Sequence, residues 1–364
     1  MTRIRSVETE LVRVPQEEPV GLSGGPPVES FLHVVVTLRT DDGLEGTSYV
    51  FSTRARAVPF IQRAVEDLAE QVVGEQVGPP QRLWQKLWAA LGAYDHGGPA
   101  VSALTALDVG LWDLWGKALG QPVYRLLGGL RQRVPTYASQ GLWRGYSIDR
   151  LQRNAADLVA KGFRAMKLRL AGEGDDALAV ERVRRVREAI GPDIALMVDV
   201  NFHWTVPQAI RVGRRIQEFD LTWLEDPVPA RDIAGCARVA AALDVPIATG
   251  EAQVTRYPFL GLIQSGAADI PMVDLQRLGG ISEWPKVAAL AESFGLPVVP
   301  HLLPEFHRHV AGALSNLMTV EYMPWSFALL KNPPQPDPDG CLAIPETPGL
   351  GIELDRPAIA RWRV

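Results

Sequence analysis

Between Met197 and His301, short apolar runs end again and again in an ionisable residue. The runs are MVDVN, LTWLEDP, IATGE, MVDLQ and VVPH, and they carry Asp199, Glu225, Glu251, Asp274 and His301 at or near their ends. Apolar runs of this length are typical of strands buried on both faces in a parallel sheet. In a parallel α/β barrel, the residues that follow the carboxyl ends of the strands meet at one mouth. The pattern therefore predicts a barrel whose mouth carries ionisable chemistry.

The composition limits the classes of partner. A chain of 364 residues with 47% hydrophobic residues can form a large core and more than one domain. Its net charge of -5 gives no basic surface for nucleic acid, and no apolar run is long enough to predict a membrane span or a signal core. We expect a cytoplasmic protein with a small-molecule partner. Cys236 and Cys341 have no metal-site or disulfide spacing and are interpreted as packing residues.

Residues 1–130 have the pattern of an α+β domain. Residues 7–14, 31–38 and 44–51 alternate apolar and polar side chains, which predicts a β-meander. The intervening segment 17–30, EEPVGLSGGPPVES, is rich in Gly and Pro and is expected to lack regular structure, as an inert loop or as a lid. Helical spacing then follows in segments 57–73, 79–91 and 101–119, and the last helix should stop at Gly120.

Residues 131–325 have the pattern of a (β/α)8 barrel. Amphipathic stretches alternate with apolar strand candidates. These candidates end near Ser139, Arg169, Val200, Glu225, Gly250, Asp274, His301 and Tyr322. Residues 326–364 include a Pro-rich turn at 332–340 and are expected to return to the first domain.

Three carboxylates follow consecutive predicted strands. Asp199, Glu225 and Glu251 would converge at the mouth, where they repel one another unless a cation lies between them. An all-oxygen ligand set favours Mg²⁺ over zinc. Each carboxylate alone could instead cap the helix of its own loop. Three carboxylates at the same place after consecutive strands favour a magnesium site.

Asp274 and His301 end neighbouring predicted strands. The carboxylate can hold one imidazole nitrogen and leave the other free as a general base. Glu321, at the end of the eighth strand, lies opposite the metal carboxylates and as a neutral acid could donate to a developing oxyanion. The later histidines, His307 and His309, are expected to be exposed.

Lys167 and Arg169 are two residues apart in AMKLRL, so their side chains should point the same way from the second strand. Directed inward, these two cations beside a metal site would bind an anion. Directed to solvent, they would be ordinary strand-end residues.

Taken together, these motifs resemble those of the mandelate racemase subgroup of the enolase superfamily, over nearly the whole chain. The segment ALDVGLWDLWGKALGQPVYRLLGG is similar to the link between the capping domain and the barrel in that family. The resemblance implies Mg²⁺ ligands at Asp199, Glu225 and Glu251, with Asn201 beside the first, an Asp274–His301 dyad and an electrophilic Glu321. It further implies abstraction of the proton α to a substrate carboxylate under a capping domain, a loop tyrosine matched by Tyr49, and a homo-oligomer such as an octamer.

One motif departs from that family. A Lys-x-Lys pair usually ends the second strand, with the second Lys as a base, whereas this chain has Lys167-Leu168-Arg169. A guanidinium keeps its proton at ordinary pH, so Arg169 is a poor base and a good clamp. A single base at His301 favours dehydration of a sugar acid, an aldonate or aldarate, to a 2-keto-3-deoxy acid. A racemase or epimerase, a cycloisomerase and a catalytically silent relative are the alternatives.

Overall fold

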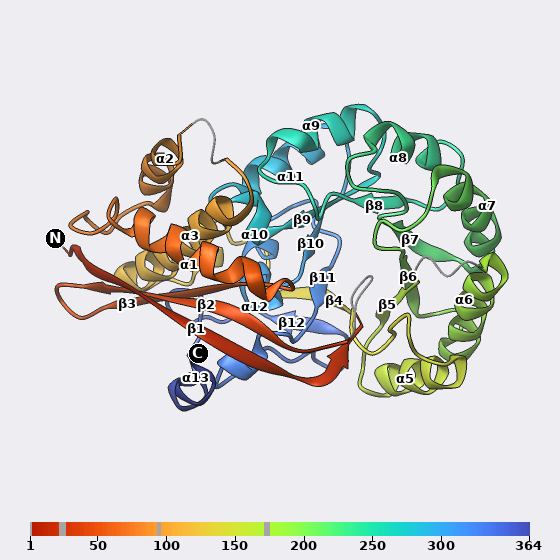
Figure 1. The fold of residues 1–364 in the computed structure, drawn as a ribbon, viewed down its shortest axis with the longest axis horizontal. Helices are drawn as coiled ribbons and strands as arrows, with labels where there is room; N and C mark the ends of the chain where they lie inside the picture. Colours follow the sequence, from red (N-terminus) through yellow and green to blue (C-terminus); the bar gives the residue numbers. More distant parts are fainter. Residues whose placement is uncertain (1, 22–26, 93–95, 171–174) are drawn as a thin grey trace.

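The chain forms a three-stranded antiparallel sheet with its helices, set beside an eight-stranded parallel barrel (Figure 1). The computed structural model describes residues 2–21, 27–92, 96–170 and 175–364. The predicted fold class, an α+β capping domain plus a (β/α)8-type barrel, is confirmed. No helix in these four described ranges is both long enough and apolar enough to cross a membrane.

The antiparallel sheet contains β1 (Ile4–Val20), β2 (Val28–Thr40) and β3 (Glu45–Ser52) in that order. The prediction that segment 17–30 lacks regular structure was wrong at both of its ends. β1 continues to Val20 and pairs there with Val28 at the start of β2, after a register shift that follows Pro15. Hydrogen bonds from the partner strand outweigh the local turn propensity of these residues. Residues 22–26, the middle of the proposed lid, lie outside the described residues.

The central strand β2 is buried on both faces. Leu32 and Val34 pack in the cluster formed with the helices, whereas Phe31 and Val35 belong to the large cluster that continues into the barrel. The helices on the first face are α1 (Val58–Ala69), α2 (Pro80–Ala90) and α3 (Gly98–Leu119), as predicted. α3 ends at Gly120, whose φ of 64° is left-handed and suits glycine. The sheet therefore rests between its own helices and the barrel.

The barrel strands end where the sequence predicts, to within one residue. They are β4 (Arg133–Ala138), β5 (Ala165–Arg169), β6 (Ala195–Asp199), β7 (Leu221–Glu225), β8 (Ile247–Thr249), β9 (Ile270–Asp274), β10 (Val299–His301) and β11 (Val320–Tyr322). They pair in parallel in the order β10-β9-β8-β7-β6-β5-β4-β11, and β10 contacts β11 where the barrel closes. Alternate residues such as Met197 and Trp223 fill the interior, and their neighbours pack outward on the helices.

The barrel strands are connected by helices on the outside of the barrel. These are α5 (Ile148–Ala160), α6 (Asp176–Ile190), α7 (Val206–Ile216), α8 (Ile233–Ala240), α9 (Tyr257–Gln264), α10 (Leu275–Leu278), α11 (Trp284–Ser293) and α12 (Pro304–Ala311). The short α10 contacts α3 of the first domain. Thr105 of α3 donates to the carbonyls of Leu275 and Gln276, and the amide of Phe51 donates to the Gln276 side chain at 2.7 Å. The capping domain thus touches the helix that begins directly after Asp274.

The C-terminal segment returns to both domains. β12 (Cys341–Ala343) pairs antiparallel with the first half of β4, and α13 (Arg356–Trp362) packs on β1. A further bridge joins Val12 of β1 to Arg363. Both cysteines are free, with Cys236 buried and Cys341 half-buried, as expected of packing residues. Figure 1 shows the C-terminus beside the antiparallel sheet.

Candidate active site

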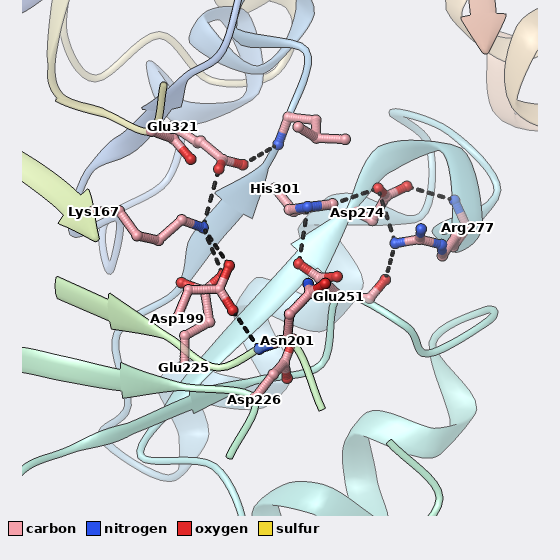
Figure 2. Close-up of polar contacts among 12 residues, drawn as sticks. Lys167, Asp199, Asn201, Glu225, Asp226, Glu251, Asp274, Arg277, His301 and Glu321 are labelled. Atoms are coloured by element: carbon pink, nitrogen blue, oxygen red, sulfur yellow. Dashed lines mark hydrogen bonds and ion pairs between the residues drawn. The ribbon is translucent and has the colours of Figure 1, made fainter. Parts of the chain in front are cut away.

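The barrel strands place ionisable side chains in one layer at the mouth. In the parallel register, Arg169 of β5 pairs with Asp199 of β6, which in turn pairs with Glu225 of β7. On the other side of the mouth, Asp274 of β9 pairs with His301 of β10. Because the strands are parallel and in this register, residues distant in sequence become neighbours. Figure 2 shows Asp199 and Glu225 on one side of the mouth, and Asp274 and His301 on the other.

Asp274 and His301 form the expected dyad. Nδ1 of His301 lies 2.7 Å from Oδ2 of Asp274, while the other carboxylate oxygen of Asp274 caps α10 by accepting the amide of Arg277 at 3.0 Å. Asp274 is therefore both a helix cap and a dyad partner. Nε2 of His301 lies 2.9 Å from Oε2 of Glu251. Burial acts to lower the pKa of His301, but Glu251 and Glu321 outweigh it and raise the pKa to about 10.

Lys167 points into the barrel and is enclosed by carboxylates. Its Nζ is 2.5 Å from Oε1 of Glu225, 3.1 Å from Oε1 of Glu321 and 3.7 Å from Oδ2 of Asp199. Burial acts to lower the pKa of Lys167, but Glu225 and Glu321 raise it well above its usual range. Carboxylates, and not the neighbouring Arg169 guanidinium, are therefore the nearest partners of Lys167, and they favour its charged form.

Glu321 joins Lys167 to the turn after His301. Its Oε2 accepts the amide of Leu302 at 2.6 Å, and its Oε1 faces Lys167 (Figure 2). Burial acts to raise the pKa of Glu321, but Lys167, His301 and Arg169 outweigh it and lower the pKa to about 2. In this arrangement Glu321 is ionised rather than the neutral acid that the sequence suggested.

The turn after His301 is left-handed and held from both sides. Leu302 and Leu303 have φ values of 58° and 45°, a region that branched side chains seldom adopt. His307 donates from Nδ1 to the Leu302 carbonyl at 2.6 Å, and its Nε2 accepts from Trp284 at 3.1 Å. His307 is fully buried, as is His309, so the expectation of exposed histidines was wrong. Burial lowers the pKa of His307 to about 4, which keeps it neutral.

Three neighbouring carboxylates at the barrel mouth form a group that could hold a metal ion. Glu225, Asp226 and Glu251 each offer a carboxylate oxygen, and these atoms lie within 4.8 Å of one another in a buried setting. Oδ2 of Asp226 is buried and has no hydrogen-bond partner among the described residues. Burial raises the pKa of Glu225 to about 8, and the neighbouring carboxylates add to this against the effect of Lys167. Mutually repelling, sulfur-free carboxylates with an unpaired oxygen fit a hard divalent cation.

Asp199 lies next to this group but is held by other partners. Its Oδ2 accepts from Nη1 of Arg169 at 2.8 Å, and its Oδ1 accepts the amide of Asn201 at 2.7 Å. Burial acts to lower the pKa of Arg169, and Asp199 raises it above its usual value, so the guanidinium stays charged. The structure thus brings Asp199, Asn201 and Arg169 together at one side of the carboxylate group.

Tyr49 lies in β3 rather than in a loop, and its partner is a carboxyl group outside the set at the barrel mouth. Its hydroxyl donates to Oε1 of Glu305, and both side chains are buried. The match to a loop tyrosine was therefore wrong in its local structure, because Tyr49 pairs with Val35 inside the sheet. A substrate contact for Tyr49 has no support in this arrangement.

The sequence interpretation missed several side chains that shape the site. Nη1 of Arg277 donates to the Glu251 carbonyl at 2.7 Å, and Trp143 lies under the Arg169 guanidinium, 5.3 Å from ring centroid to Cζ. Trp143 also lines a cavity of about 810 Å³ that borders Val20, α5 and Trp325. A helix-capping signature around Asp274 could have indicated Arg277. Trp143 follows the first barrel strand, in segment 141–146, and nothing in the sequence there distinguishes it from a packing residue.

Two family models match this chain over most of its length. Residues 6–128 match the mandelate racemase/muconate lactonizing enzyme N-terminal domain, and residues 150–358 match the enolase C-terminal domain-like family. The chain belongs to the mandelate racemase/muconate lactonizing enzyme family of the enolase superfamily. An L-talarate/galactarate dehydratase of Salmonella typhimurium is 34% identical over 99% of this chain and 91% of its own length. A 3,6-anhydro-alpha-L-galactonate cycloisomerase of Streptomyces coelicolor is 31% identical over 99% of both chains.

A solved structure of an enolase superfamily relative supports the same assignment. The crystal structure of L-talarate dehydratase from Polaromonas sp. JS666, complexed with Mg and L-glucarate, has a TM-score of 0.91 and 33% sequence identity. The match covers 100% of this chain and 98% of that one. The resemblance drawn from the sequence motifs is confirmed, and it extends to both the capping domain and the barrel.

Proposed function

We propose that this protein is a Mg²⁺-dependent dehydratase of sugar acids, converting an aldonate or aldarate to a 2-keto-3-deoxy acid. The observation that carries the proposal is the Asp274–His301 dyad beside Glu251. Glu251 raises the pKa of His301, but its charge would be offset when it holds Mg²⁺, which would leave the imidazole free to act as the base. Lys167 is held as a cation by carboxylates, and Arg169 is a guanidinium paired with Asp199. Elimination of water can proceed with one base, whereas racemisation needs proton transfer on both faces.

The site residues account for proton movement. His301, oriented through Nδ1 by Asp274, would take the α-proton at Nε2. The neighbouring carboxylates stabilise the imidazolium that forms. The same imidazolium can give its proton to the departing β-hydroxyl, which leaves as water, and the resulting enol becomes the 2-keto-3-deoxy acid. Arg169 and Lys167 at the mouth supply positive charge toward an anionic substrate.

Magnesium fits the carboxylates that the structure brings together. Glu225 and Glu251 would hold it together with Asp199 from the neighbouring strand, and the magnesium complex of the Polaromonas relative supports the choice of ion. When bound, Mg²⁺ would offset the negative charge that develops on the substrate acid as its α-proton is lost.

Deuterium exchange tests the single-base assignment. In D₂O, the wild-type protein with Mg²⁺ and a panel of aldonates and aldarates should form a 2-keto-3-deoxy acid, detected by mass spectrometry. His301→Asn should give neither this product nor deuterium at the α-carbon of recovered substrate. Exchange that survives His301→Asn but disappears in Lys167→Ala would favour a racemase or epimerase.

A cycloisomerase is the second candidate, because the Streptomyces relative with that activity matches the full length of this chain. It would use the same base but release no water. Incubation with sugar-acid lactones or anhydro acids, followed by product analysis, separates the two activities. Formation of a ring-opened or rearranged isomer without a 2-keto-3-deoxy acid would favour the cycloisomerase.

A cytoplasmic location, a homo-oligomeric assembly and the domain limits 1–130, 131–325 and 326–364 stay predictions. Light scattering of the full chain tests the assembly, and limited proteolysis tests the limits. A monomer in solution would contradict the predicted oligomer.

A further inference from the structure

Asp226 follows Glu225 directly, yet both carboxylates belong to the same group. Successive residues of a strand point to opposite faces, so a regular continuation of β7 would direct Asp226 out of the barrel mouth. The backbone of Asp226 is left-handed instead, with φ of 44°. This conformation is uncommon for a residue other than glycine, and it brings a carboxylate oxygen of Asp226 within 4.8 Å of the ligand atoms of Glu225 and Glu251.

Three contacts hold Asp226 in this conformation. Its amide donates to the Ala248 carbonyl at 3.0 Å, and its carbonyl accepts the amide of Phe202 at 2.8 Å. Its Oδ1 accepts the hydroxyl of Thr249 at 2.6 Å. One oxygen remains, Oδ2, which is buried without a hydrogen-bond partner in the described part of the chain. Burying a carboxylate oxygen without a hydrogen-bond partner costs free energy, and so does a left-handed backbone at a residue other than glycine. The two costs together indicate that Oδ2 has a partner that is not a protein group.

The charges of the group indicate what that partner is. Glu225 is paired with Lys167, and Glu251 is paired with His301. None of the ion pairs between described residues includes Asp226. Its completely buried side chain therefore places a third carboxyl group beside two carboxylates, with no side-chain cation in contact. A hard divalent cation is the ligand that an unpaired oxygen in such a setting would take.

We infer that Asp226 is part of the divalent-cation site, its Oδ2 contributing to cation affinity beside Glu225 and Glu251. The inference rests on the proposed Mg²⁺-dependent function and adds a residue to it. Thr249 is then a positioning residue that orients the Asp226 carboxylate through Oδ1.

Calorimetry with Mg²⁺ alone tests the inference on the full chain stripped with a chelator. Asp226→Asn keeps the shape of the side chain, and asparagine tolerates the left-handed conformation, so the variant should fold. We expect its Kd for Mg²⁺ to rise by about 10- to 100-fold. Glu305→Gln is the matched control, because Glu305 is also a buried carboxyl with an unpartnered oxygen but lies outside the carboxylate group. Its Mg²⁺ affinity should equal that of the wild type.

The outcomes separate this inference from the proposed function. A wild-type chain that binds no Mg²⁺ would overturn both. A wild type that binds Mg²⁺, together with an Asp226→Asn variant of equal affinity, would overturn only the role of Asp226. Should Asp226→Asn fail to fold, Thr249→Val decides the question, since it keeps the charge and removes the orienting hydroxyl. A several-fold weaker affinity in Thr249→Val supports the inference, and an unchanged affinity overturns it.

Discussion

Replacing Lys167 by Met should destabilise the metal-free protein far more than the loss of an exposed lysine. The Lys167 ammonium is completely buried and lies within 4 Å of carboxylates on three different strands, at 2.5, 3.1 and 3.7 Å. Removing one member of a buried ion pair costs about 3–5 kcal/mol, because the remaining charge stays buried without compensation. Lys167→Met leaves Glu225 without its cation and Glu321 with only the more distant Arg169. We therefore expect a loss of about 4 kcal/mol in the free energy of unfolding.

Urea unfolding in the presence of a chelator measures this loss. With a slope of about 3 kcal/mol per M, the midpoint should fall by roughly 1 M. Excess Mg²⁺ at about 100 times its Kd should restore about 2.7 kcal/mol, because the ion binds the folded state. Lys331→Met is the matched control, since its pair with Glu353 is exposed and should contribute at most about 1 kcal/mol. A Lys167→Met midpoint as high as that of the Lys331→Met control would refute the argument.

Three further predictions follow from the site and its surroundings. Glu225→Gln should abolish Mg²⁺ binding in calorimetry and turnover in the dehydration assay, and full activity in chelator-stripped protein would contradict the metal requirement. The pKa of Glu305 is raised by burial from 4.5 to about 7, so its stabilising contribution is complete below pH 4.5 and is lost as the pH rises through 7. Glu305→Gln should therefore remove about 3 kcal/mol of the fall in unfolding free energy across this window, and an equally steep fall in urea midpoints between pH 4.5 and 8 would contradict it. His307→Phe should release the Leu302 carbonyl and lower kcat by about 10- to 100-fold while KM changes less. A variant in which KM alone changes would show that His307 does not position the base.

The sequence predicts most of the barrel and of its site because each strand carries its own signal. Apolar runs that end in Asp199, Glu225, Asp274 or His301 indicate both a strand and an ionisable residue at its end. The parallel register then places these strand ends side by side at the mouth. Those predictions depend only on alternation along one strand. They are correct to within a residue at the strand ends.

Features that depend on distant partners were missed. Alternation along β7 predicts that the Asp226 side chain points away from that of Glu225. The left-handed φ that changes its direction cannot be predicted from the sequence. α12 reads as a polar surface helix, yet its histidines are buried beneath residues from other parts of the chain, with His309 accepting the amide of Tyr124. The ends of β1 and β2 become strands only because each supplies the other's hydrogen bonds.

The C-terminal segment has a practical consequence for protein engineering. β12 pairs with β4 of the barrel, and α13 packs on β1 of the capping domain. The C-terminal segment therefore connects the barrel to the capping domain. A barrel excised at residue 325 would lose both attachments and leave backbone groups of β4 unpaired. Chimeras that exchange the capping domain between relatives should therefore exchange the C-terminal segment as well. The N-terminal domain and residues 326–364 have to come from the same parent protein.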